Sequence, residues 1–254
     1  MDRLVFSSLA AISDPSARTQ LNNEIANMST TGFKKSFMNA STAIKVSGPG
    51  FDTRYSPTNS NQDRIALAAG PVLHTGNKLD VAMNGNTVMA TTGANNELAY
   101  TRRGDLRVNS MGLLETGAGQ AVRGQNGPVS VPPGFSMTIT EDGSVFATNP
   151  AGPATTPPTL VGRIMLRDAS DTKLQRRLDG LFEPVGAKGS EGREITNGKE
   201  TASLIPQSLE GSNVSPYESM VRLMEMNRSY EQSIKMIQEA KSVDESGTQL
   251  LKVV

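Results

Sequence analysis

A strong helix start near the C-terminal end constrains this chain more than any other feature. Within Ser215-Pro-Tyr-Glu218, the serine is placed as an N-cap, the proline as the first helical residue and the glutamate three positions after the cap. Apolar residues then recur at helical steps, and these are Met220, Leu223, Tyr230, Ile234 and Ile237. A helix from Pro216 to about Val243 spans roughly 40 Å. Because one apolar stripe runs along a charged rod of this length, the helix needs a partner that covers the stripe.

The N-terminal region carries a second amphipathic pattern. Residues from Leu4 to Met28 are predicted to be helical, with a kink or a restart at Asp14-Pro15, because proline removes a backbone donor. Gly32 is predicted to end this region, since glycine adopts the left-handed conformation after a helix at little cost. Glu24 falls outside the apolar face, which is formed by Leu4, Ala11, Leu21, Ile25 and Met28.

The middle of the chain changes from helical to strand periodicity. Residues 39–77 lack a sustained period and collect Gly, Pro and Asn, which indicates an extended linker that could include a hairpin. From Leu79 to about Thr201, short alternating stretches with frequent turn residues predict antiparallel strands. Asn84-Gly85 is predicted to connect one hairpin, and Glu141-Asp-Gly-Ser144 another.

This order of elements predicts a mixed fold class. We expect an all-β central domain of short antiparallel strands, flanked by N- and C-terminal α-helices that pair as a coiled-coil-like stem. Since neither apolar stripe has cover in its own neighbourhood, we also expect the termini to be poorly ordered in the free chain. The predicted parts are an N-terminal helical segment at 1–38, a linker at 39–77, an all-β outer domain at 78–205 and a C-terminal helical segment at 206–254, which pairs with the first.

The composition excludes several classes of partner. Lys plus Arg and Asp plus Glu number 25 each, so no net charge attracts nucleic acid. The absence of cysteine excludes disulfides and cysteine-ligated metals. No apolar run approaches the ~18 residues of a membrane-spanning helix, and the serines and charges of residues 1–14 argue against a cleaved signal peptide. We therefore expect no nucleic-acid partner and no direct membrane insertion.

No stretch of the sequence supplies a convincing catalytic, cofactor-binding or metal site. His74 is the single histidine and has no G-x-S-x-G motif beside it, and Gly117-Ala-Gly119 lacks the third glycine of a dinucleotide fingerprint. The acidic turns at Asp142 and Asp168 do not have the spacing of a calcium loop. We therefore expect no catalytic residue, no cofactor and no metal. Two classes remain as alternatives: a secreted wall-active hydrolase, which needs paired carboxylates or a metal cluster, and a binding module with dispensable helices.

Both ends of the chain resemble the signatures of the bacterial flagellar rod and hook proteins. Residues 23–35 are similar to the N-terminal signature of this family, and residues 209–214 and 228–231 to its C-terminal one. Five stretches between them are similar, in the same order, to the middle domain of the family: residues 79–82, 100–104, 112–114, 127–132 and 141–143. The signature positions in this chain are Asn27, Thr31, Gly32, Phe33, Ser212, Asn213, Val214, Tyr230 and Glu231.

The resemblance implies a structural subunit of the flagellar basal-body rod, which transmits torque and catalyses no reaction. It implies copies of the chain and other rod proteins as partners, and passage through the flagellar export apparatus without a cleaved signal into the rod that crosses the periplasm. The opening Met1-Asp-Arg-Leu4 and residues 127–132 favour a proximal-rod member, with a distal-rod or hook-type axial subunit as the alternative. The expected assembly interface consists of Leu4, Leu21, Ile25, Met28, Met220, Leu223, Tyr230, Ile234 and Ile237.

Overall fold

The computed structural model describes most of the chain, and its residues divide into two units. A helical unit comprises Met1–Met28 with Val214–Val254, and a β unit comprises Ser29–Asn213. The predicted boundaries at residues 38 and 205 lie inside this β unit. The described residues are 15–37, 42–45, 55–58, 64–93, 96–132, 134–151, 157–185 and 194–251.

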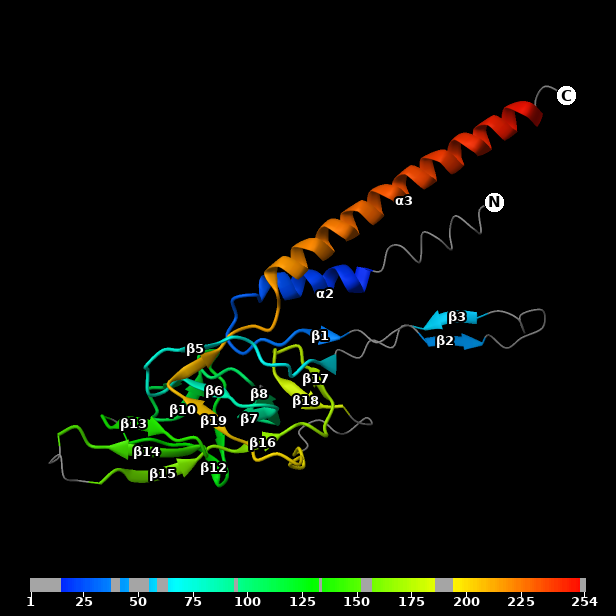
Figure 1. Ribbon diagram of the computed structural model, residues 1–254. Coiled ribbons are helices and arrows are strands. Elements are labelled where there is room, and N and C mark those ends of the chain that lie inside the picture. The colour runs from blue at the N-terminus through cyan, green and yellow to red at the C-terminus, as the bar shows by residue number, and fades with distance from the viewer. Residues whose placement is uncertain are drawn as a thin grey trace. The chain divides into compact units, whose positions relative to one another are not determined.

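Two helices are described in the helical unit. The first, α2 (Pro15–Ala26), begins at the proline that was expected to restart the helix, and the predicted turns before it lie outside the described residues. The second, α3 (Pro216–Leu251), begins where predicted but extends past Val243, because no proline interrupts the residues that follow. Figure 1 shows α2 beside the first turns of α3, running in the opposite direction. No helix among the described residues is both long enough and apolar enough to cross a membrane.

The β unit consists of short strands joined by turns, as the alternating pattern predicts. They are β1 (Ser36–Phe37), β2 (Thr42–Lys45), β3 (Tyr55–Thr58), β4 (Arg64–Ile65), β5 (Val72–His74), β6 (Val81–Met83), β7 (Thr87–Thr92), β8 (Leu98–Thr101), β9 (Leu106–Val108), β10 (Leu114–Thr116), β11 (Arg123–Gly124), β12 (Gly127–Pro128), β13 (Ser136–Ile139), β14 (Ser144–Thr148), β15 (Thr159–Arg163), β16 (Leu166–Asp168), β17 (Leu174–Arg176), β18 (Phe182–Pro184), β19 (Leu204–Pro206) and β20 (Ser208–Glu210).

The largest sheet has the order β1-β4-β17-β18-β8-β7-β16, and all its neighbours are antiparallel. Tyr100 of β8 lies opposite Ala90 of β7 on one side and Phe182 of β18 on the other. Successive residues of β7 serve different apolar clusters, with Met89 in one and Val88 in the other. Both faces of β7 are therefore buried, as strand alternation requires for a central strand between two cores.

A second sheet has the order β13-β14-β15. Its first hairpin pairs Ile139 with Val145, and the turn holds Gly143 at φ 80°. The strand pairing confirms the prediction that Glu141-Asp-Gly-Ser144 forms a hairpin turn. Glycine suits this turn because it takes the left-handed conformation without a Cβ penalty.

The last segment of the β unit returns to strands near its beginning. We call residues 204–213 the closing segment. Its β19 pairs with β6, aligning Leu204 with Met83, and its β20 pairs with β5, aligning Leu209 with Leu73. Between these strands, Gln207 adopts φ 54°, which is unusual for a residue with a side chain.

Two features differ from the sequence-based expectation. Residues 39–77 were expected to be a linker, but β4 pairs with β17 and β5 with β20. Asn84-Gly85 does form a turn, with the Thr87 N–H donating to the Asn84 carbonyl at 3.0 Å. The flanking strands nevertheless pair elsewhere, β6 with β19 and β7 with β8 and β16. The Arg102 side chain donates to the Met83 and Thr87 carbonyl oxygens beside the turn.

Candidate functional site

The start of α3 has the expected cap. The Glu218 N–H donates to Ser215 Oγ at 3.4 Å, and Glu218 Oε1 accepts from Arg222 Nη2 at 2.8 Å. The first contact satisfies a backbone donor that the helix cannot satisfy by itself, and the second places opposite charges one helical turn apart. The sequence signals of the helix start are confirmed.

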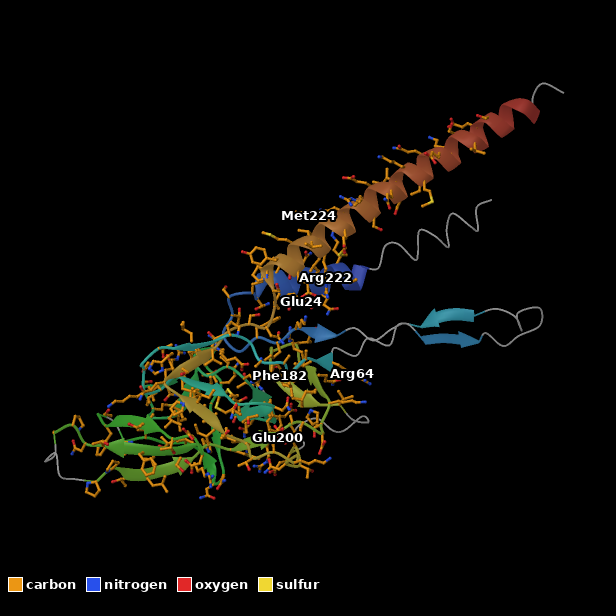
Figure 2. All side chains as sticks on the ribbon, viewed as in Figure 1. Glu24, Arg64, Phe182, Glu200, Arg222 and Met224 are labelled. Carbon is orange, nitrogen blue, oxygen red and sulfur yellow. The ribbon has the colours of Figure 1, made fainter. Side chains whose placement is uncertain are left out.

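The apolar side chains of α3 are largely open in the single chain. Met220 is 57% exposed and Tyr230 is 58% exposed, while Leu223 is half-buried. Ile234 and Ile237 are 39% and 37% exposed. Further apolar residues, including Met224, are exposed on other sides of the same helix (Figure 2). The predicted stripe therefore gains little cover from the described part of the helical unit.

The N-terminal members of the predicted interface are more covered. Leu21 of α2 is buried, and Ile25 and Met28 are half-buried. Leu4 lies outside the described residues. Glu24 was expected away from the apolar face, but it is buried; its Oε2 lies 3.9 Å from Arg222 Nη1 of α3 (Figure 2), and its Oε1 accepts from Gln20 at 3.1 Å. A buried carboxylate is tolerated here because a hydrogen bond and a facing guanidinium compensate for lost hydration.

The signature residues of the two chain ends meet within the β unit. Asn213 Oδ1 accepts from the Lys35 backbone N–H at 2.6 Å, and the Asn213 backbone N–H donates to the Phe33 carbonyl at 3.3 Å. Asn213 Nδ2 also donates to the Ala66 carbonyl at 3.0 Å. One asparagine thus holds three segments of the β unit together: the residues before β1, the residue after β4 and the end of the closing segment.

Gly32 occupies a position that few other residues could fill, and the neighbouring Phe33 makes a cation–π contact. Gly32 has φ 68°, and its N–H donates to the Glu210 carbonyl at 2.7 Å. An added Cβ at Gly32 would lie 2.3 Å from the Arg102 carbonyl oxygen. The Arg176 guanidinium carbon stacks 4.1 Å from the centre of the Phe33 ring.

The other signature residues differ in burial and contacts. Asn27 donates through Nδ2 to the Asn23 carbonyl at 2.9 Å, and Thr31 is half-buried. Ser212 and Val214 are buried, whereas Tyr230 and Glu231 are exposed on α3.

A buried ionic cluster joins the beginning, the middle and the end of the β unit. It consists of Lys34, Arg102 and Glu210, and we call it the junction cluster. Glu210 Oε1 accepts from Lys34 Nζ at 2.6 Å and from Arg102 Nη2 at 3.0 Å, and Oε2 accepts from Arg102 Nε at 2.8 Å. All three side chains have 0% exposure. Burial, followed by the nearby Arg102 charge, lowers the pKa of Lys34, while the hydrogen bond to Glu210 opposes this shift.

The sequence pattern did not predict the junction cluster. Each member lies inside a stretch that carries the family resemblance, Lys34 in 23–35, Arg102 in 100–104 and Glu210 in 209–214. The signal that could have found them is that all three stretches contain charged residues, although Glu24, Lys35 and Arg103 occur in the same stretches and are not part of the cluster. Charge alone does not predict burial, because Lys, Arg and Glu are usually exposed.

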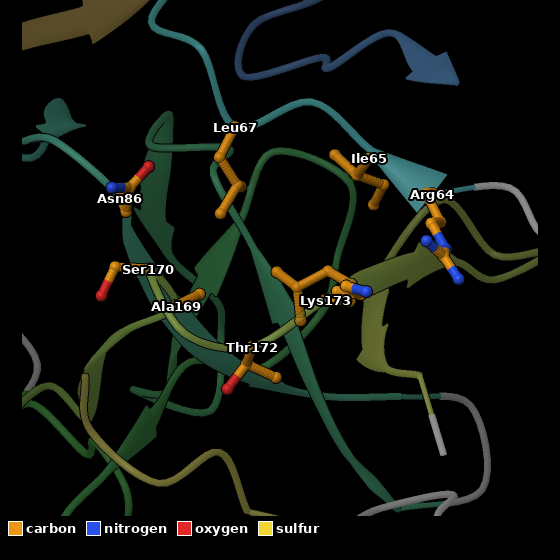
Figure 3. A pocket seen from close by; sticks show the side chains of 9 residues that line it. Arg64, Ile65, Leu67, Asn86, Ala169, Ser170, Thr172 and Lys173 are labelled. Atoms are coloured by element: carbon orange, nitrogen blue, oxygen red, sulfur yellow. The ribbon is translucent and has the colours of Figure 1, made fainter. Parts of the chain in front are cut away.

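We looked among the described residues for groups that could act in catalysis or bind a metal ion. His74 is exposed, and its Nδ1 lies 3.4 Å from Ser208 Oγ, but that hydroxyl donates to the Pro206 carbonyl at 3.1 Å. No group of three or more His, Asp or Glu residues in the described chain is arranged to hold a metal ion. A cavity of about 290 Å³ (Figure 3) has Leu67 and Leu174 among its apolar lining and Arg64 and Lys173 as cations. None of the described residues that line it is a carboxylate or an imidazole.

Two family descriptions match this chain. "Flagellar hook protein FlgE/F/G D1 domain" matches residues 82–147, within the β unit. "Flagellar basal body rod FlgEFG protein C-terminal" matches residues 205–250, which include most of the closing segment and most of α3. The β unit, the terminal helices and these two matches together define the class of flagellar rod and hook proteins.

Curated relatives narrow this class. The flagellar basal-body rod protein FlgF of Salmonella typhimurium is 32% identical over 247 residues, covering 97% of this chain and 96% of that protein. FlgF of Escherichia coli K12 shows the same identity and coverage. FlgG of Buchnera aphidicola subsp. Baizongia pistaciae is 26% identical over 85% of this chain and 86% of its own length. The chain belongs to the family of the flagellar basal-body rod protein FlgF.

Proposed function

We propose that this chain is a structural subunit of the bacterial flagellar basal-body rod, in its proximal part. It assembles through its terminal helices with copies of itself and with other flagellar rod proteins. Membership of the FlgF family supports the assignment to the rod. The subunit transmits torque and catalyses no reaction.

The observation that carries this proposal is the exposure of apolar side chains along α3. Met220, Tyr230, Ile234 and Ile237 all exceed one-third exposure in the single chain. Transfer of apolar surface out of water is the main favourable contribution to most protein association. A long helix with such a face gains most when neighbouring helices cover it, and many lateral contacts of this kind suit a load-bearing assembly.

Pairing of the two terminal helices as a coiled-coil-like stem is part of the same proposal. The facing pair Glu24 and Arg222 supports it, as does the burial of Leu21. Under this proposal Leu4, Ile25 and Met28 extend the covered face, while Leu223 and Ile237 meet α2 or a neighbouring subunit.

The location and route follow from the same assignment. We place the subunit in the basal body, in the rod that crosses the periplasm, after passage through the flagellar export apparatus without cleavage of a signal peptide. The names of the relatives support the basal-body location.

A charge at Ile234 tests the proposal directly. Ile234→Asp should prevent incorporation into rods and abolish motility, because assembly would bury an unpaired carboxylate. The β unit should stay folded, which circular dichroism and limited proteolysis check. Gln232→Asp is the matched control, since it places the same charge at an exposed position about 200° away around the helix. Normal rods containing Ile234→Asp would contradict the proposal.

A distal-rod or hook-type axial subunit is the second candidate, because a FlgG relative also matches most of the chain. The two assignments differ in the order of assembly. A strain lacking the proximal subunit should accumulate basal bodies that stop before the distal rod forms. If distal-rod protein were already present in those basal bodies, the proximal assignment would fail while membership of the rod class would stand.

A further inference from the structure

The Glu210 carboxylate accepts hydrogen bonds from three other segments of the β unit. Lys34 Nζ, the Arg102 guanidinium and the Gly70 backbone N–H all donate to its carboxylate, at distances of 2.6 to 3.0 Å. We propose that these donors form a carboxylate-binding socket, that the chain fills it with its own Glu210, and that this occupancy locks the closing segment in place. The inference concerns the β unit alone and does not depend on the rod assignment.

The two cations of the socket are held by contacts that do not involve Glu210. Arg102 Nη1 donates to the Gly85 carbonyl at 2.6 Å, and Nη2 donates to the Met83 carbonyl at 2.9 Å. Lys34 Nζ donates to the Ala68 carbonyl at 2.8 Å. Because these partners lie outside the closing segment, the donors keep their positions without Glu210. Such preorganisation favours binding, since less ordering is required when the ligand arrives.

The charge of the socket selects the chemical class of its ligand. Two cations with no exposed side-chain surface face one carboxylate, so an empty socket holds two uncompensated buried charges. The guanidinium uses Nε and Nη2 against the two carboxylate oxygens, which is the paired geometry that planar oxyanions accept. A neutral group of the same shape lacks the charge that compensates for this burial.

The closing segment has local features that make a lock useful. Its strands β19 and β20 are only three residues each. Gln207 between them holds a left-handed backbone, which disfavours this bend in an isolated segment. The Gly211 N–H donates to the Pro71 carbonyl at 2.8 Å, so the Glu210 side chain enters the socket where the segment passes the start of β5.

Chemical rescue of Glu210→Ala in the full chain tests this inference. The variant should melt on the order of 10 °C below the natural chain, because two buried cations lose their counter-charge. Acetate at constant ionic strength should then raise its melting temperature in a saturable manner, whereas chloride and acetamide should not. Equal responses to acetate in the variant and the natural chain, or no response in a folded variant, would overturn the proposal.

Glu115→Ala is the matched control for carboxylate loss. Glu115 Oε1 accepts from Arg107 Nε at 2.7 Å, but the Arg107 side chain is 59% exposed. Water therefore replaces the lost carboxylate, and acetate should not change the melting temperature of this variant. A rescue of the same size in Glu115→Ala would show that acetate acts without the socket, which would overturn the proposal.

A second pair of variants keeps the proposal testable if Glu210→Ala does not fold. Glu210→Gln retains the side-chain shape and leaves two buried cations, and adding Lys34→Met removes one of them. The double variant should melt at a higher temperature than Glu210→Gln alone. Additive destabilisation would show that the two residues contribute separately, which contradicts a socket defined by charge.

Discussion

The ammonium nitrogen of Lys34 lies 2.6 Å from Oε1 of Glu210, although 176 positions separate the two residues in the chain. Lys34 follows the N-terminal helical segment, and Glu210 precedes α3. The Gly32 N–H and the Glu210 carbonyl form a backbone bond at the same place. Residues near the beginning and the end of the β unit are therefore fixed to each other by buried polar contacts.

Lys34 should make the stability of the β unit depend on pH. Because the folded chain lowers the pKa of Lys34, the unfolded chain binds more protons between that lowered value and 10.5. The free energy of unfolding should therefore rise with pH through this window and lose this contribution below it. Urea unfolding of the natural chain and of Lys34→Met measures the difference, which should grow with pH in favour of the natural chain.

The exposed Lys199 supplies the control for this pH series. Lys199→Met removes a lysine charge from an exposed position of the same unit and gives the baseline for the Lys34→Met series. A difference between the natural chain and Lys34→Met that stays constant with rising pH would show that Lys34 titrates alike in the folded and unfolded states. A difference that falls would show that folding raises the pKa of Lys34, and either result contradicts the prediction.

Gly32→Ala should be far more destabilising than Gly76→Ala. Both glycines have left-handed backbones, with φ of 68° and 74°, so each alanine costs roughly 1–2 kcal/mol for its conformation. Only at Gly32 would the new Cβ also meet the Arg102 carbonyl at 2.3 Å, whereas nothing lies within 4 Å at Gly76. Denaturant unfolding should show an additional loss for Gly32→Ala. Equal losses would mean that the chain moves away from Arg102 at little cost.

Local sequence signals predicted local structure well. Ser215 and Glu218 mark the start of α3, and Asp142-Gly143 marks the turn of the hairpin between β13 and β14, because both features depend on residues a few positions apart. The mostly β character of the centre and the flanking helices followed from the change of periodicity. The N-terminal helix is described only from Pro15 to Ala26.

Contacts between distant segments could not be predicted in the same way. Arg102 follows β8 directly, but Thr101 and Tyr100 are buried as well, so alternation does not distinguish an inward charged residue here. Glu210 lies 108 positions from Arg102, and no local pattern links them. Strands β4 and β5 are only two and three residues long, too short to show a period, so the sequence pattern of residues 39–77 is that of a linker.

Asp142 should titrate well below an ordinary aspartate. Hydrogen bonds from the Thr140 hydroxyl and then from the Ser144 hydroxyl lower its pKa from 3.8 to about 2. The stabilisation is present above the ordinary value and is lost as the pH falls through about 2, although exposure of the pair with Arg163 keeps it small. Thr140→Val should raise the pKa in an NMR titration of the Asp142 carboxyl carbon. An unchanged titration would assign the shift to other contacts.

Removal of the Ser215 cap should loosen the first turn of α3. Ser215→Ala loses the oxygen that accepts from the Glu218 N–H, and such caps contribute about 0.5–2 kcal/mol. Hydrogen exchange of the first-turn amides should become faster, while Ser215→Asp should keep them protected. Unchanged exchange in Ser215→Ala would mean that water or another group already satisfies these donors.

Accessibility of Met220 before and after assembly tests the central claim most directly. The chain contains no cysteine, so Met220→Cys introduces a single thiol at a position that is 57% exposed. Maleimide should label this thiol rapidly in the isolated subunit and slowly in purified rods, whereas the β-unit control Lys199→Cys gives the baseline for general access to the rod. Selective protection of Met220→Cys is the result that we predict. Equal labelling of Met220→Cys in the isolated subunit and in rods would contradict the claim that α3 is covered on assembly.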